Sequence, residues 1–333
     1  MTVAAPVVWP RLEDVIDPIR KIVDGADQIS CLAHKDADAD SLGSALGFAL
    51  ALRASGHRVR VVVPEPLPRL LEYLPGFETV ETGGALLGDT VFTFDCATLP
   101  RFGERRDEVE RAATVVNIDH HLSNTAFGSI NLVDASASAT GQVVYRMLGL
   151  LGAPITAAVA TNLYAALLTD TGGFRHENTT EAALRLGAAL VAAGADPSWV
   201  ALKSYKSRSL SQVRLEGLSI AGMVAELGGS LLWSEVTGVM LDQVGADMQE
   251  SEGIIDALQS IATMEIAILF KETTPNRTKL SVRTREPFDA TDVCTPFGGG
   301  GHRRAAGAEL GEALPDARRL VLEVARRLIE SAR

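Results

Sequence analysis

Three clusters of acidic and histidine residues each stand where a β-strand is expected to end, which restricts the chain to folds that gather strand ends together. The clusters are residues 34–40 (HKDADAD) after QISCLA, Asp95 after VFTF, and residues 119–121 (DHH) after TVVNI. In an open α/β sheet, ligands bind beyond the carboxyl ends of the strands. Four or more carboxylates in one crevice repel one another unless a cation lies between them. The sequence therefore predicts a metal site.

Strands and helices alternate through the first half of the chain. Short β-branched runs predict buried strands, and segments with helical spacing lie between them. This alternation predicts an α/β fold with a mostly parallel sheet flanked by helices. We expect strands over 28–33, 57–64, 91–95 and 114–119, and helices near 11–23, 41–55, 104–111, 138–152, 155–170 and 180–194.

The second half predicts a smaller mixed α/β domain. A long helix near 208–227 leads into it, and strands over 264–272 and 278–286 are expected to form a hairpin. A helix near 251–262, a glycine-rich turn and a last helix over 314–332 complete the domain. We expect a metal-binding catalytic domain over 1–200, a helical linker over 201–228 and a substrate-binding domain over 229–333.

Charge and cysteine usage exclude some classes of protein. The net charge of −11 argues against a general nucleic-acid coat, which needs a large basic surface. A small anionic substrate stays allowed, because bound divalent cations invert the local field. The three cysteines are odd in number and far apart, which is typical of free thiols in a reducing compartment.

No segment indicates export or membrane insertion. The start, MTVAAPVVWP, lacks a basic region and is interrupted by two prolines, so we do not expect a signal peptide. Apolar stretches are too short or too polar to span a membrane. The expected location is the cytoplasm.

His34, Asp38 and Asp40 form an H-x3-D-x-D pattern on the loop after the first strand. In an extended loop, alternate side chains point in different directions, so Asp38 and Asp40 are expected to reach two neighbouring cations. The other reading of such a loop is a helix N-terminal cap. Asp36 is an additional carboxylate whose role stays open.

Asp95 ends an apolar strand, where an unpaired carboxylate is costly. A bridging position between two metal ions satisfies both of its oxygens; a cap on the next turn is the alternative. Asp170 stands at a predicted helix end, before two glycines that leave room for a metal or a phosphate, or simply in a helix-terminal turn. Neither His57 nor His176 is expected to take part, although His176 is close to Asp170 in sequence.

Carboxylate and imidazole ligands together favour Mn²⁺, with Mg²⁺ or Co²⁺ as alternatives. Two such ions about 3.5–4 Å apart generate hydroxide at neutral pH and clamp the oxygens of an in-line phosphoryl displacement.

Residues 271–304 are expected to bind an anion, because they hold seven basic residues against four acidic ones. Arg283 lies on a predicted strand, and its planar guanidinium suits phosphate oxygens. A glycine run ending at His302 is expected to cradle a phosphate with its backbone N–H groups, before a helix that starts at the Ala-Ala-Gly segment. A flexible linker is the alternative. The run is Gly298, Gly299, Gly300 and Gly301.

These motifs resemble the DHH phosphoesterase superfamily. HKDADADSLGS, Asp95, the DHH triplet and TDTG are similar to its four motifs, and GGGGHRRAAG is similar to the signature of its DHH-associated C-terminal domain. The resemblance extends from about residue 28 to 310, in order. The family often has Pro and Gly where Ala37 and Ala39 stand, which affects only the rigidity of the loop.

The resemblance implies roles for individual residues. One Mn²⁺ would be held by His34, Asp38 and Asp95, and the other by Asp40, Asp95, His120 and Asp170. Asp95 and His121 would be catalytic, with His121 contacting the substrate phosphate or supporting a ligand. Arg283, His302 and the glycines Gly299, Gly300 and Gly301 would bind the nucleotide.

The expected activity is Mn²⁺-dependent hydrolysis of short nucleotides, by a phosphodiesterase or phosphatase. Substrates would be short single-stranded RNA (nanoRNA), 3′-phosphoadenosine-5′-phosphate (pAp), or linear and cyclic dinucleotides such as cyclic di-AMP. We expect neither duplex nucleic acid nor a membrane as a partner. We do expect the chain to form a homodimer. The alternatives are an inorganic pyrophosphatase or polyphosphatase of the same superfamily, and a catalytically silent nucleotide sensor.

Overall fold

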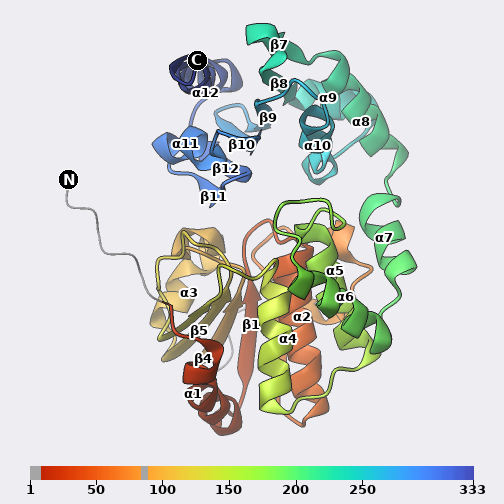
Figure 1. Cartoon of the computed structure of the whole chain (residues 1–333), viewed down its shortest axis with the longest axis vertical. Helices are drawn as coiled ribbons and strands as arrows, with labels where there is room; N and C mark the ends of the chain where they lie inside the picture. Colours follow the sequence, from red (N-terminus) through yellow and green to blue (C-terminus); the bar gives the residue numbers. More distant parts are fainter. Residues whose placement is uncertain (1–8, 84–88) are drawn as a thin grey trace, which may run out of the picture. The chain divides into compact units, whose positions relative to one another are not determined.

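The computed structural model describes residues 9–83 and 89–333. It contains two compact units, Met1–Ser207 and Arg208–Arg333 (Figure 1). Each has its own hydrophobic core. The first eight residues, where we expect no signal peptide, lie outside the described part. Among the helices of residues 9–83 and 89–333, none combines the length and the apolar character that crossing a bilayer requires.

The first unit contains the parallel sheet that the alternation predicts. Its six strands are all parallel and follow the order β3-β2-β1-β4-β5-β6. The two short strands β3 and β6 were not predicted. The strands are β1 (Ile29–Ala33), β2 (Val59–Val62), β3 (Val80–Glu81), β4 (Thr90–Phe94), β5 (Thr114–Asp119) and β6 (Ile130–Val133).

Both faces of this sheet are buried, as strand alternation requires. One face presents Phe92 and Phe94, which contact Phe48 of α2. The other face presents Leu32 and neighbouring valines, which pack against the segment from Leu99 to Arg111. Each such side chain contributes about 1.5–3 kcal/mol on burial, so apolar packing on both faces fixes where the strands end.

Three helices, α2, α4 and α5, pack against one another on one side of the sheet (Figure 1). Glycines let their backbones approach closely: a Cβ on Gly43 would lie 2.8 Å from the Asn162 carbonyl oxygen, and one on Gly141 would lie 2.7 Å from Ala166 Cβ. The helices of this unit are α1 (Leu12–Gly25), α2 (Ala39–Ala54), α3 (Arg106–Arg111), α4 (Thr140–Leu151), α5 (Ala157–Asp170), α6 (Glu181–Ala192) and α7 (Pro197–Tyr205).

The second unit is a mixed six-stranded sheet in the order β11-β12-β10-β9-β8-β7. The predicted hairpin is present, because β9 and β10 pair antiparallel. Apolar side chains cover both faces, in two clusters. The elements are α8 (Leu210–Ala221), β7 (Val224–Glu226), β8 (Leu231–Val236), α9 (Gly238–Val244), α10 (Ile254–Gln259), β9 (Ile266–Thr274), β10 (Arg277–Thr284), α11 (Ala290–Cys294), β11 (Gly300–His302), β12 (Ala305–Leu310) and α12 (Leu314–Ser331).

Two predictions for this unit are wrong. The helix expected over 208–227 ends at Ala221, because Gly222 caps it and Val224 then pairs with Trp233 of β8. The Ala-Ala-Gly segment starts strand β12 rather than a helix. It pairs with β11, which is possible because Gly301 has a φ of 145° and any Cβ there would lie 2.5 Å from the Ala305 carbonyl oxygen.

Candidate metal centre

The acidic and histidine clusters meet at the carboxyl ends of β1, β4 and β5. Strand order reverses between β1 and β4, and a crevice at such a switch point is the usual ligand site of an open α/β sheet. His34 directly follows β1, Asp95 directly follows β4, and His120 directly follows β5. The prediction that these three clusters come together is confirmed by their distances, given below.

Asp38 and Asp40 stand at the start of α2 and do not share an extended loop: Asp38 keeps an extended backbone as the N-cap, which was the alternative interpretation, and Asp40 is helical. Asp38 is the N-cap of α2: its Oδ1 accepts a hydrogen bond from Ser41 N at 2.9 Å, and its Oδ2 lies 3.9 Å from His34 Nε2. Asp40 is in the first turn and is buried. Acidic residues favour both places, because the helix N-terminus has unpaired N–H groups and a positive partial charge.

The N-terminus of α4 holds the carboxylate of Asp40. Thr140 N donates to one oxygen at 2.7 Å, and Gly141 N donates to the other at 2.9 Å. Ser44 Oγ adds a third donor at 3.3 Å. Sequence reasoning missed this use of α4, because the contact joins residues 100 positions apart.

Asp95 is the centre of the cluster. Its oxygens lie 3.5 Å from His34 Nε2, 3.4 Å from His120 Nε2 and 3.5 Å from His121 Nδ1. Thr140 Oγ1 donates to Asp95 Oδ1 at 2.9 Å. The backbone of Asp95 is left-handed, with φ of 56°, a conformation that Asp tolerates better than most residues.

Backbone carbonyls orient two of the imidazole rings. His34 Nδ1 lies 2.7 Å from the Lys35 oxygen, and His120 Nδ1 lies 3.1 Å from the Ala137 oxygen. Each Nδ1 must therefore carry the proton, which leaves Nε2 as the ligand atom facing the carboxylates. His34 Nε2 is buried and forms no hydrogen bond within the described residues, as expected of an atom that coordinates a metal.

His121 has a different partner. Its Nδ1 lies 2.7 Å from Oδ1 of Asp119, a fully buried carboxylate. The same oxygen accepts hydrogen bonds from the backbone N–H groups of His120, at 2.8 Å, and His121, at 3.2 Å. Asp119 thus orients the histidine pair, a role that the sequence did not reveal.

Asp170 joins the cluster from the C-terminal end of α5, as predicted. Its Oδ2 lies 3.7 Å from His120 Nε2. His176, expected outside the site, contacts the backbone of Asp170: its Nδ1 lies 3.3 Å from the Asp170 carbonyl oxygen. Asp36 has a left-handed φ of 58° in the turn before α2, and His57 lies just before β2, at the opposite end of the strands.

The electrostatics of the cluster fit bound cations. Burial and the neighbouring Asp95 raise the pKa of Asp40 well above its ordinary value, and burial raises the pKa of Asp170 to about 6. Burial also opposes ionisation of Asp95, but His121, His120 and His34 outweigh it and hold its pKa well below the ordinary value. The same carboxylates raise the pKa of His120 against the effect of burial.

Without a bound metal, protons on the imidazole rings balance the negative charge of the carboxylates. Divalent cations can take over this role. Two of the groups whose ligand atoms lie within 4.8 Å of one another match the predicted sites: His34 with Asp38 and Asp95, and Asp40 with Asp95 and His120. Both groups contain Asp95. The donors are nitrogen and oxygen without thiolate, which suits Mn²⁺, Mg²⁺ or Co²⁺.

The second unit places Arg283 and His302 in one row across its sheet. Arg283 of β10 pairs with Ala305 of β12, and Ala305 pairs with His302 of β11. Directly paired residues lie on the same face, so both side chains flank the small Ala305, on backbones roughly 9.5 Å apart. The next row on that face is Ser281, Gly307 and Gly300. The result is a surface of small residues between a guanidinium and an imidazole.

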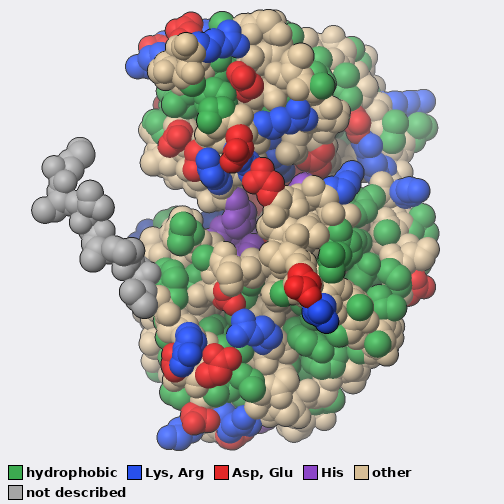
Figure 2. All heavy atoms as spheres, viewed as in Figure 1, with side chains coloured by type: hydrophobic (Ala, Val, Ile, Leu, Met, Phe, Trp, Pro, Cys, Tyr) green, Lys and Arg blue, Asp and Glu red, His purple; other side chains and the backbone are tan. Residues whose placement is uncertain are grey.

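Most of the other basic residues of 271–304 pair with carboxylates or backbone carbonyls within the unit. Lys271 is buried and its Nζ lies 2.8 Å from Glu252, while Arg285 donates to the carbonyl oxygens of Gln259 and Ala262. Arg277 and Arg304 also form ion pairs. Acidic and basic side chains are interspersed on the face drawn in Figure 2. Arg283 is more weakly paired, with Nε 3.7 Å from Asp256.

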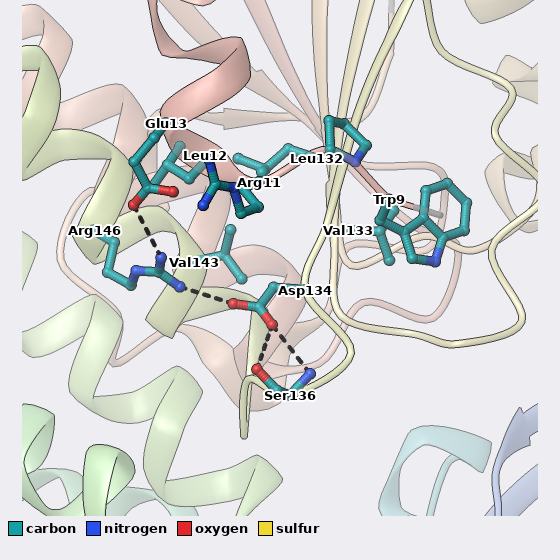
Figure 3. A pocket seen from close by; sticks show the side chains of 11 residues that line it. Trp9, Arg11, Leu12, Glu13, Leu132, Val133, Asp134, Ser136, Val143 and Arg146 are labelled. Atoms are coloured by element: carbon teal, nitrogen blue, oxygen red, sulfur yellow. Dashed lines mark hydrogen bonds and ion pairs between the residues drawn. The ribbon is translucent and has the colours of Figure 1, made fainter. Parts of the chain in front are cut away.

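A separate cavity of about 320 Å³ lies between the start of α1 and strand β6. Trp9 and Arg11 line it, and Arg146 lies between Glu13, at 3.6 Å, and Asp134, at 2.8 Å (Figure 3). Because Arg146 is neutralised by these two carboxylates, the cavity offers no group suited to the chemistry of the metal centre.

Two domain models match the chain: the DHH family N-terminal domain over residues 28–167 and the DHHA1 domain over residues 228–331. A relative from Thermus thermophilus, named bifunctional oligoribonuclease and PAP phosphatase NrnA, is 33% identical over 96% of this chain and 95% of its own length. The chain belongs to the DHH phosphoesterase superfamily. It is thus a hydrolase of phosphoester bonds.

Other DHH proteins resemble the chain over most of its length. A Bacillus subtilis protein with the same name is 25% identical over 85% of this chain and 90% of its own. The crystal structure of an exopolyphosphatase-related protein from Bacteroides fragilis aligns with a TM-score of 0.85 and 25% identity, over 96% of each chain. The DHH and DHHA1 matches fall in the first and second units, respectively.

Proposed function

We propose that this chain is a Mn²⁺-dependent phosphodiesterase and phosphatase that hydrolyses short nucleotides. The observation that carries the proposal is the position of Asp95, which is common to the ligand groups of His34 and Asp38 on one side and of Asp40 and His120 on the other. A carboxylate shared in this way suits the bridge of a two-metal site.

His34, Asp38 and Asp95 would hold one cation, and Asp95, Asp40 and His120 the other, with Asp170 completing the second site. A bound pair of divalent cations lowers the pKa of water and stabilises the charge that develops during phosphoryl displacement. Within the chain, Thr140 and the start of α4 hold Asp95 and Asp40 in place, and carbonyl groups aim the Nε2 atoms of His34 and His120.

His121 acts on the substrate in this proposal. Asp119 accepts a hydrogen bond from Nδ1–H, so Nε2 is the ring nitrogen available to contact a phosphate oxygen. In the metal-free chain, the carboxylates of Asp95 and Asp119 raise the pKa of His121 against the effect of burial. When the ring also carries a proton on Nε2, it donates that proton to the leaving oxygen as the P–O bond to the leaving group breaks, while the attacking water bonds to phosphorus and releases its own proton to solvent.

The second unit would bind the rest of the nucleotide. Arg283 and His302 flank a surface where Ala305, Gly307 and Gly300 leave the backbone open to close approach by a phosphate or a base. Gly299 and Gly301 shape the same hairpin, because a Cβ on either would meet β12 closer than 2.6 Å. The names of the Thermus and Bacillus relatives support short RNA and pAp as substrates, and cyclic di-AMP has the same phosphodiester chemistry.

The cellular setting is part of the proposal. The three cysteines are free and buried, which is typical of a reducing compartment and supports a cytoplasmic location. We propose a homodimer, which sedimentation of the purified chain tests directly.

One panel of substrates tests the activity. Dinucleotide RNA, cyclic di-AMP, pAp, pyrophosphate and polyphosphate are each incubated with Mn²⁺ and with chelator. We expect turnover of the nucleotides with Mn²⁺ only, and none with Asp95→Ala. Polyphosphate is included because the Bacteroides fragilis structure is described as exopolyphosphatase-related. A wild-type protein that binds these nucleotides and hydrolyses none of the panel is a sensor, and the proposal fails.

Arg283→Ala separates substrate binding from metal binding. A hydrogen bond to a charged group contributes about 1.5–3 kcal/mol, so KM should rise roughly 10- to 100-fold while metal content stays the same. Arg277→Ala is the matched control, since Arg277 is on the same strand, is exposed and pairs with Glu309. Loss of bound Mn²⁺ in Arg283→Ala would contradict this division of roles.

A further inference from the structure

Four buried polar side chains form a continuous hydrogen-bonded series that ends at His121: Thr93, Asn117, Asn124 and Asp119. Asn117 Nδ2 donates to Thr93 Oγ1 at 2.9 Å, and Asn117 Oδ1 accepts from Asn124 Nδ2 at 2.7 Å. Asn124 Nδ2 also donates to Asp119 Oδ2 at 2.6 Å, and Asp119 Oδ1 lies 2.7 Å from His121 Nδ1. None of these residues is more than 6% exposed. Such groups are retained in a core only when they are fully bonded.

The direction of both amides is fixed. Asn124 Oδ1 accepts from Ala126 N at 2.8 Å, so rotating this amide by half a turn would place two donors together and aim an oxygen at Asp119. Asn117 Nδ2 also donates to the Cys96 oxygen at 3.1 Å, which excludes the reversed amide in the same way. The amide of Asn124 therefore donates in both directions, to Asn117 Oδ1 and to Asp119 Oδ2, and Asn117 donates onward to Thr93 and to the Cys96 carbonyl.

The fixed direction of the amides has a consequence for His121. One oxygen of Asp119 is filled by the Asn124 amide, and the other receives two backbone N–H groups and the ring of His121. With the carboxylate held as an acceptor on both sides, His121 Nδ1 must be the donor. When the ring is neutral it is then confined to the form with the proton on Nδ1, and its Nε2 faces away from Asp119.

The same amides also hold the turn that carries Asp95. The carbonyl of Cys96, the next residue, accepts from Asn117 Nδ2 at 3.1 Å and lies 3.3 Å from Asn124 Nδ2, whose two hydrogens are directed to Asn117 and Asp119. Asp95 has the left-handed φ of 56°, which persists only when neighbouring groups restrain it. Two features of the centre, the ring of His121 and the turn of Asp95, thus depend on one pair of amides.

We propose that Asn117 and Asn124 are positioning residues for hydrolysis, which set the tautomer of His121 and the orientation of Asp95. Neither contacts the reacting atoms; they act through Asp119 and the Cys96 carbonyl. The inference rests on the proposed function, because it assigns His121 the contact with the substrate.

Asn124→Leu removes the donors without a large change in volume. In the metal-free protein, at a pH high enough for the His121 ring to be neutral, ¹⁵N NMR of the ring should show a mixture of tautomers in place of the single Nδ1–H form of the wild type. With saturating Mn²⁺, kcat should fall roughly 10- to 100-fold, as for other outer partners of a metal centre, and KM should change little. Asn117→Ala keeps the bond between Asn124 and Asp119 and should show a smaller decrease, which gives a second test if Asn124→Leu does not fold.

Asn131→Leu is the matched control. Its amide also makes two hydrogen bonds, at 2.9 and 2.7 Å, but to the backbone of Gly128. It should alter neither the tautomer nor kcat. A single Nδ1–H form together with wild-type kcat in Asn124→Leu overturns the inference. If instead the wild type hydrolyses none of the substrates, the proposed function fails, and the NMR measurement on metal-free protein still decides the tautomer.

Discussion

Thr140→Val tests whether the start of α4 organises the metal centre. The side chain is buried, and Oγ1 donates to Asp95 Oδ1 at 2.9 Å, whereas the Thr140 backbone N–H serves Asp40 and is unaffected by the change. Valine has nearly the same shape, so the loss is confined to one donor. A hydrogen bond to a charged group is worth about 1.5–3 kcal/mol. Loss of a residue that hydrogen-bonds a metal ligand lowers metal affinity roughly 10- to 100-fold. Because a tenfold change in affinity corresponds to about 1.4 kcal/mol, this range of affinities agrees with the energy of the lost hydrogen bond.

The assay is calorimetric titration of Mn²⁺ into metal-free protein. Thr140→Val should raise Kd roughly 10- to 100-fold, and Thr140→Ser, which keeps the hydroxyl, should bind as the wild type does. Thr278→Val is the control, because Thr278 is equally buried in the second unit and donates to the Glu312 oxygen at 3.0 Å. It should lose stability without loss of affinity. Equal Kd values for Thr140→Val and the wild type would refute the role of α4.

Three further results are expected. Because the pKa values of His120 and His121 are raised in the folded state and that of Asp170 is raised to about 6, the stabilisation they give exists at low pH and is lost as pH rises through these values. Differential scanning fluorimetry of metal-free protein should therefore show Tm falling as the pH rises above about 6, and a larger gain from Mn²⁺ at the higher pH; a rising Tm would contradict this. The three cysteines are buried and their thiol pKa values are raised, to about 12 for Cys294, so Ellman's reagent should label none until denaturant is added. Gly301→Ala forces strain at a φ of 145° and a contact with β12, and should destabilise the second unit by about 1–3 kcal/mol in urea, whereas Gly300→Ala, with open space around it, should not.

The sequence predicted the centre well where chemistry and strand ends coincide. His34, Asp95 and His120 each follow an apolar strand, and in a parallel sheet such positions must share one edge. Asp170 could be predicted for a related reason, because the glycines after it indicate the end of a helix. The residues that were found are those whose role follows from their immediate neighbours in the chain.

The supporting groups were missed because their role depends on contacts between distant segments. Thr140 and Asp40 are 100 residues apart, and nothing near Thr140 indicates a partner carboxylate. Asn124 resembles any turn asparagine until the buried side of β5 is known. The β11–β12 hairpin was not predicted for the opposite reason. Gly and Ala disfavour strands locally, and these small residues are required here only because the two backbones approach each other closely. The assignment of metal and substrate roles to individual residues stays a prediction.

The candidate ligands come from the loop after β1, the start of α2, the turn after β4, the end of β5 and the end of α5, so they are spread over more than a hundred residues. No short fragment of the chain carries a complete pair of sites, and an unfolded chain offers only scattered carboxylates and imidazoles. A cation that binds only the native arrangement stabilises it by RT ln(1 + [M]/Kd). Metal supply would then influence how long each molecule of the protein persists as well as how fast it works, since the metal-poor population unfolds more often and is more open to proteolysis.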